Sequence, residues 1–106
     1  MASIASVKST ILVADDHQEI LDFITEDLGD NYHVLKAKDG AQALAFLESS
    51  AVDLIVSDVM MPEINGFDLC ARLKEDINFS HIPFIMLTAK NSLQSKIEGL
   101  EYGADA

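Results

Sequence analysis

The chain has 106 residues, of which 49% are hydrophobic and 24% charged, and this balance indicates one globular domain rather than a disordered segment. Its 7 basic against 18 acidic residues give a net charge of −11, which opposes direct contact with nucleic acid or with an anionic membrane surface. No apolar stretch approaches the length of a bilayer span, so we expect no membrane insertion.

The start of the chain is short of charge. Lys8 is the only charged residue among the first ten, and the segment resembles neither a signal peptide nor a transit peptide. We expect residues 1–9 to be an N-terminal extension and residues 10–106 to form the domain. The single Cys70 excludes an internal disulfide and suits a reducing, cytoplasmic location. Its helical spacing predicts a core residue rather than a nucleophile.

The first half of the chain alternates between strand and helix patterns. A near-continuous apolar run at 10–14 predicts a strand buried on both faces, and residues 17–28 have apolar residues at helical spacing with Gly29 as the stop. A half-polar run at 32–37 predicts a strand near a sheet edge. Asp39 is expected to cap the next helix, which Ser49-Ser50 ends.

The second half repeats the alternation. Residues 54–57 predict a second buried strand, and residues 61–66 predict a loop. A helix follows, and Pro83 precedes a third buried strand at 84–87. A last helix is expected to begin at Asn91 or Ser92 and to end at Gly103. The inward face of the helix before Pro83 is expected to carry Phe67, Cys70, Leu73 and Ile77.

This alternation with short connections predicts an α/β fold with a doubly wound parallel sheet. Asp15 and Asp16 follow the first strand and Asp58 follows a second, so their carboxylates are expected to meet at the carboxyl edge of the sheet. Crowded carboxylates repel one another, and a hard cation such as Mg²⁺ relieves the repulsion. The residues therefore predict a magnesium site.

Simpler interpretations exist for each acid. Asp15 and Asp16 could cap the following helix, and Asp58 could be a turn residue. Two observations favour a functional crevice instead: both acidic features end buried strands, and Thr88 places a hydroxyl after the third. The three histidines His17, His33 and His81 lack metal-site spacing, and His17 is interpreted as a residue that caps or flanks the first helix.

The motifs Val13-Ala14-Asp15-Asp16, Ser57-Asp58-Val59-Met60-Met61-Pro62 and Leu87-Thr88-Ala89-Lys90 occur in this order together with Gly66. In that order and spacing they resemble the response-regulator receiver domain of two-component signalling, with the CheY fold. The resemblance spans residues 10–106. The sequence around Asp58 and Thr88 is similar to that of receivers of hybrid sensor kinases.

The resemblance implies a role for each matching residue. Asp58 would be the phosphoacceptor, Thr88 the switch hydroxyl, and Asp15, Asp16, Asp58 and the Met60 backbone carbonyl would hold Mg²⁺. The partner would be a histidine kinase or the phosphotransfer domain of a hybrid kinase. The domain would be a signalling module with at most self-phosphorylation and slow self-dephosphorylation, and not a conventional enzyme.

The sequence departs from the family at its end. Residues 101–106 resemble the segment before the fifth strand, so the family lysine, fifth strand and fifth helix are expected to be missing. Lys90 is not expected to replace the family lysine. An exposed edge at 84–87 then predicts self-association. A phosphorylation-incompetent interaction module stays open as the alternative. A haloacid-dehalogenase-type phosphatase is disfavoured, because its second Asp is replaced by Met60.

Overall fold

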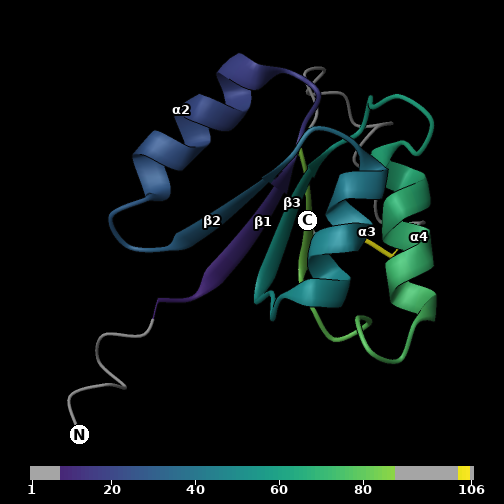
Figure 1. Cartoon of the computed structure of the whole chain (residues 1–106). Coiled ribbons are helices and arrows are strands. Elements are labelled where there is room, and N and C mark those ends of the chain that lie inside the picture. The colour runs from purple at the N-terminus through teal and green to yellow at the C-terminus, as the bar shows by residue number, and fades with distance from the viewer. Residues whose placement is uncertain (1–7, 88–102, 106) are drawn as a thin grey trace, which may run out of the picture.

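The computed structural model describes residues 8–87 and 103–105. Strands and helices alternate along the chain, and Figure 1 shows them in space. Their bounds are β1 (Thr10–Ala14), α2 (Gln18–Leu28), β2 (His33–Ala37), α3 (Gly40–Ser49), β3 (Leu54–Asp58), α4 (Gly66–Glu75) and β4 (Phe84–Leu87).

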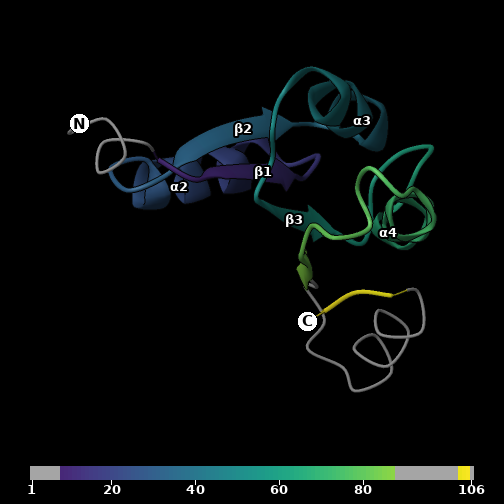
Figure 2. The same ribbon diagram turned by 90° about the horizontal axis from the view of Figure 1, so that it is seen from below.

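The four strands form one sheet in the order β2-β1-β3-β4, and every neighbouring pair is parallel. Helix α2 lies on one face of this sheet and α3 on the opposite face, as Figures 1 and 2 show from two directions. The predicted doubly wound α/β architecture is therefore confirmed. The half-polar strand β2 lies at the edge of the sheet, as predicted.

Alternate residues of β1 enter two separate apolar clusters, because successive side chains of a strand point to opposite faces. Leu12 and Ala14 pack in the larger cluster, whose members come also from α3, α4, β3 and β4. Ile11 and Val13 pack with Leu21 of α2 in the smaller one. This division explains why β1 reads as a continuous apolar run rather than an alternating one.

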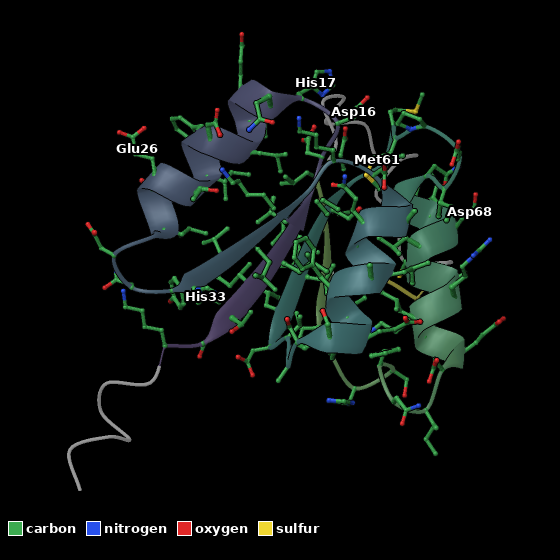
Figure 3. All side chains as sticks on the ribbon, viewed as in Figure 1. Asp16, His17, Glu26, His33, Met61 and Asp68 are labelled. Atoms are coloured by element: carbon green, nitrogen blue, oxygen red, sulfur yellow. The ribbon has the colours of Figure 1, made fainter. Side chains whose placement is uncertain are left out.

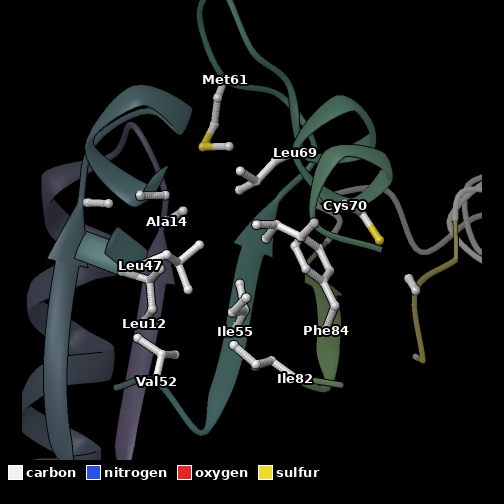
Figure 4. Packing of buried hydrophobic residues seen from close by; sticks show 14 residues of the cluster. Leu12, Ala14, Leu47, Val52, Ile55, Met61, Leu69, Cys70, Ile82 and Phe84 are labelled. Carbon is white, nitrogen blue, oxygen red and sulfur yellow. The ribbon is translucent and has the colours of Figure 1, made fainter. Parts of the chain in front are cut away.

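Among the described residues, fourteen buried ones belong to the larger cluster, which is drawn in Figure 4. Phe84, the first residue of β4, is fully buried there together with Ile55 of β3 and Leu69 of α4. Cys70 is also buried in this cluster, which confirms that it is a core residue.

Asp39 caps its helix with its side chain, as the sequence predicts, whereas the side chain of His17 does not. The Asp39 side chain accepts a hydrogen bond from Gln42 N at 2.8 Å and so caps α3. His17 occupies the N-cap position of α2, but its side chain makes no capping hydrogen bond.

One expectation for α4 is wrong. The helix ends at Glu75 with Asp76 as its C-cap, so Ile77 lies beyond the helix and is 88% exposed. Leu69 takes an inward position that the predicted spacing did not include. The predicted face was read one helical turn too far, because Ile77 continues the apolar spacing after the backbone has left the helix.

Residues 103–105 lie beside the start of β4. Asp105 N donates to the carbonyl oxygen of Phe84 at 2.9 Å, and the Asp105 carboxylate accepts from Phe84 N at 2.9 Å and from Lys74 Nζ at 3.2 Å. These bonds occupy both backbone groups of the first β4 residue. The self-association expected along the β4 edge stays a prediction.

Two further expectations fall on residues outside the described ranges: the hydroxyl of Thr88 and the helix beginning at Asn91 or Ser92. Within residues 8–87 and 103–105, no helix is both long enough and apolar enough to cross a membrane.

Candidate functional site

The ends of β1 and β3 deliver the three predicted carboxylates to one place. The two strands pair in parallel with Ala14 opposite Ser57. The next residue of each chain segment is an acid, Asp15 directly after β1 and Asp58 at the end of β3, so the two acids lie side by side. Ligand atoms of Asp15, Asp16, Asp58 and His17 all lie within 4.8 Å of one another. Figure 3 shows Asp16 and His17 at this edge of the sheet, near Met61 of the loop after β3. The predicted convergence of the three aspartates is thus present.

Asp15 is held in place by its surroundings. Asp15 is 1% exposed. Its backbone N–H donates to the Ala37 carbonyl of β2 at 3.0 Å, and its Oδ1 accepts from His17 N at 2.8 Å. This local turn fixes the direction of one carboxylate before α2 begins. Asp16 is more open, with a side chain that is 34% exposed.

Asp58 is the last residue of β3 and is only 8% exposed. Burial, followed by the charge of Asp15, raises the pKa of the Asp58 carboxyl, while hydrogen bonds from the backbone N–H groups of Met60 and Val59 oppose the shift. Burial and the charge of Asp15 therefore disfavour the ionised form of Asp58.

The loop from β3 to α4 is packed tightly against Asp58. Gly66 N donates to the Val59 carbonyl at 2.8 Å, and a Cβ atom on Gly66 would lie 2.3 Å from the Asp58 carbonyl oxygen. Only glycine fits such a close approach. Asn65 caps α4 by accepting from Asp68 N at 2.9 Å, which fixes the end of the same loop.

These donors fit a hard divalent cation. Oxygen ligands from carboxylates are what Mg²⁺ binds in proteins. A positive ion would favour the charged form of Asp58, against the burial and the charge of Asp15 that raise its pKa. The three carboxylates are the residues that would hold the ion. Met60 is 75% exposed, and the predicted role of its backbone carbonyl stays a proposal.

His17 is the site residue that the sequence analysis missed. Its Nδ1 lies 2.9 Å from Asp15 Oδ1 and 3.1 Å from Asp16 Oδ1. The hydrogen bond to Asp15, followed by the charge of Asp16, raises the pKa of the His17 imidazole. Its position directly after two strand-end acids was the available signal. His33 and His81 are exposed and are not members of the cluster.

Comparison with known proteins identifies the family. The chain matches the response regulator receiver domain over residues 11–106 and belongs to this family of two-component signalling domains, which are not classical enzymes. It is 48% identical over 98 residues to "Histidine kinase P4" of Formosa agariphila, a match that covers 92% of this chain and 7% of the relative. Its identity to the regulatory protein VanRc of Enterococcus gallinarum is 43%, covering 90% of this chain and 40% of that one.

Solved structures of similar proteins agree with this family assignment. The chemotaxis protein CheY4 of Vibrio cholerae superimposes with a TM-score of 0.87 at 33% identity, covering 92% of this chain and 82% of that one. The receiver domain of a signal transduction histidine kinase from Syntrophus aciditrophicus gives 0.83 at 34% identity, covering 92% and 74%. The fold and the receiver-domain function are therefore those that the three motifs predict. The chain spans less than half the length of the two curated relatives.

Proposed function

We propose that Asp58 is the residue that accepts the phosphoryl group, with Mg²⁺ held by Asp15, Asp16, Asp58 and the backbone carbonyl of Met60. The observation that carries the proposal is the meeting of three carboxylates at one sheet edge in a chain of the receiver family. Asp58 is preferred as the nucleophile because it lies at the centre of the receiver motif and is held by the tight loop that ends at Gly66.

In the proposed transfer, an Asp58 carboxylate oxygen attacks the phosphorus of a phosphohistidine. The new P–O bond forms as the P–N bond breaks, and the imidazole of the donor leaves with the electron pair. The backbone N–H groups of Met60 and Val59 orient the carboxylate. Bound Mg²⁺ would supply charge neutralisation for the phosphoryl oxygens. Thr88 is proposed as the hydroxyl that contacts the acyl phosphate afterwards.

The proposed donor is a histidine kinase or the phosphotransfer domain of a hybrid kinase. Two similar proteins support this: one is named a histidine kinase, and another is the receiver domain of one. The net charge of −11 supports a protein partner rather than direct contact with nucleic acid. We further infer that transfer takes place in the cytoplasm.

Mass spectrometry after incubation with acetyl phosphate and Mg²⁺ tests the acceptor. We expect one phosphoryl adduct on the wild-type chain, none on Asp58→Asn, and an unchanged adduct on the matched control Asp30→Asn, whose acid is exposed and remote from the cluster. An adduct that persists in Asp58→Asn means that another residue is the acceptor. Mg²⁺ binding without any adduct would support the alternative, a phosphorylation-incompetent interaction module.

A further inference from the structure

His17 lies beside the acidic cluster of Asp15, Asp16 and Asp58. Its backbone N–H donates to Asp15 Oδ1 at 2.8 Å, which ties the residue to the turn between β1 and α2. Its ring atom Nδ1 lies close to both neighbouring carboxylates, at 2.9 Å from Asp15 Oδ1 and 3.1 Å from Asp16 Oδ1. The side chain is 64% exposed, so no core packing holds the ring in another direction.

These separations are compatible with shared ligation of one ion. Nitrogen and oxygen ligands bind divalent transition metals at about 2.0–2.2 Å, so two ligands of one ion lie at most about 4.4 Å apart. Both Nδ1–oxygen distances are below this limit, and the set that includes Asp58 spans no more than 4.8 Å. Bringing Nδ1, Asp15, Asp16 and Asp58 around one ion therefore needs only a small contraction of the site.

The nitrogen changes which ions the site prefers. Magnesium binds oxygen ligands and retains water, whereas a neutral imidazole suits nickel, cobalt and zinc ions. We propose that His17 is a nitrogen ligand that gives this receiver site a preference for late first-row transition-metal ions over Mg²⁺. The inference rests on the proposed function in one respect: Asp15, Asp16 and Asp58 must bind a divalent cation at all.

Calorimetric titration with Ni²⁺ and with Mg²⁺ tests the preference. A background carrying His33→Ala and His81→Ala removes the two other histidines, both exposed, as adventitious Ni²⁺ ligands. In that background we expect His17→Ala to weaken Ni²⁺ binding about tenfold or more, while Mg²⁺ affinity changes by less than about threefold. His17→Phe, which retains a ring without nitrogen, is expected to behave like His17→Ala.

A spectroscopic measurement observes the ligand directly. The ¹⁵N chemical shift of His17 Nδ1 should move on saturation with Zn²⁺ and should stay near its metal-free value on saturation with Mg²⁺. The inference is overturned if His17→Ala lowers both affinities equally or neither, or if Zn²⁺ leaves the Nδ1 resonance in place. If neither ion binds the wild-type chain, or if both still bind Asp58→Asn unchanged, the metal site of the proposed function fails together with the inference. If Mg²⁺ binding depends on Asp58 while His17→Ala leaves Ni²⁺ binding unchanged, the His17 assignment alone is overturned.

Discussion

The apolar core beneath α3 and α4 and the acidic cluster at the sheet edge are built on the same strands. Ala14 ends β1 inside the core, and the next residue, Asp15, is an equally buried carboxylate. In the core, burial removes apolar surface from water and stabilises the fold. At the edge, burial raises the pKa of Asp58 and disfavours its charged form. Removing buried apolar atoms from the core should therefore lower the free energy of unfolding. Removing a buried charge from the acidic cluster should raise it.

The largest expected effect lies in the core. Phe84 is 0% exposed and is surrounded by the apolar side chains of the larger cluster. Phe84→Ala therefore leaves a cavity between the sheet and α4. We expect a loss of about 3–5 kcal/mol in the free energy of unfolding, measured by urea denaturation. The matched control Phe23→Ala, at a residue 71% exposed, should change it by less than about 0.5 kcal/mol. Equal losses for the two variants would contradict the assignment of the core.

The acidic cluster should show the opposite sign. Without metal at neutral pH, Asp58→Asn removes one of three crowded charges, and we expect it to stabilise the chain by about 1 kcal/mol. With Mg²⁺ at a hundred times its dissociation constant, the wild-type chain should gain about 2.7 kcal/mol and become the more stable of the two. Melting temperatures in EDTA and in Mg²⁺ measure this reversal.

Two results would contradict that interpretation. If Mg²⁺ leaves the melting temperature of the wild type unchanged, the acidic cluster does not bind Mg²⁺. An Asp58→Asn variant that is less stable than the wild type in EDTA would show that the carboxylate makes favourable contacts that outweigh the repulsion of Asp15.

Gly66 connects the two regions, because α4 packs on the core while its first residue touches the backbone of Asp58. Gly66→Ala would place a Cβ 2.3 Å from the Asp58 carbonyl oxygen, and we expect a loss of about 1–3 kcal/mol together with weaker Mg²⁺ binding. Asn65→Ala is the matched comparison. It removes the helix cap at a cost of about 1 kcal/mol and should leave Mg²⁺ affinity unchanged. Gly66→Ala with normal Mg²⁺ affinity would show that the loop does not position Asp58.

Much of this arrangement could be predicted from the sequence, because buried parallel strands are continuous apolar runs. The bounds of β1 were predicted correctly, and the strand ends place Asp15 and Asp58 together without any knowledge of side-chain geometry. The resemblance to the receiver family also depended on these strand ends. The pattern of residue types was sufficient wherever the fold repeats one local rule.

The remaining features depend on where the backbone turns. Ile77 continues the apolar spacing of α4, but the helix has already ended, and spacing alone does not mark that end. His17 carries no metal-site spacing in the sequence, because its ring joins the cluster through the turn after β1. The close approach of Gly66 to Asp58 is likewise a contact between backbones.

The last test compares how well the core and the edge of the sheet accommodate a charge. Burial raises the pKa of the Cys70 thiol from 9.0 to about 11, partly opposed by Lys74. A raised pKa means that the folded chain keeps a proton that the unfolded chain loses, so this stabilisation is fully present below pH 9.0 and is lost as the pH rises through about 11. Other groups titrate in the same range, so the stability difference between the wild type and Cys70→Ala isolates the thiol. We expect urea denaturation to show this difference constant below pH 9.0 and moving in favour of Cys70→Ala above it. A difference that stays constant up to pH 11 would mean that the thiolate is accommodated in the core as readily as in water.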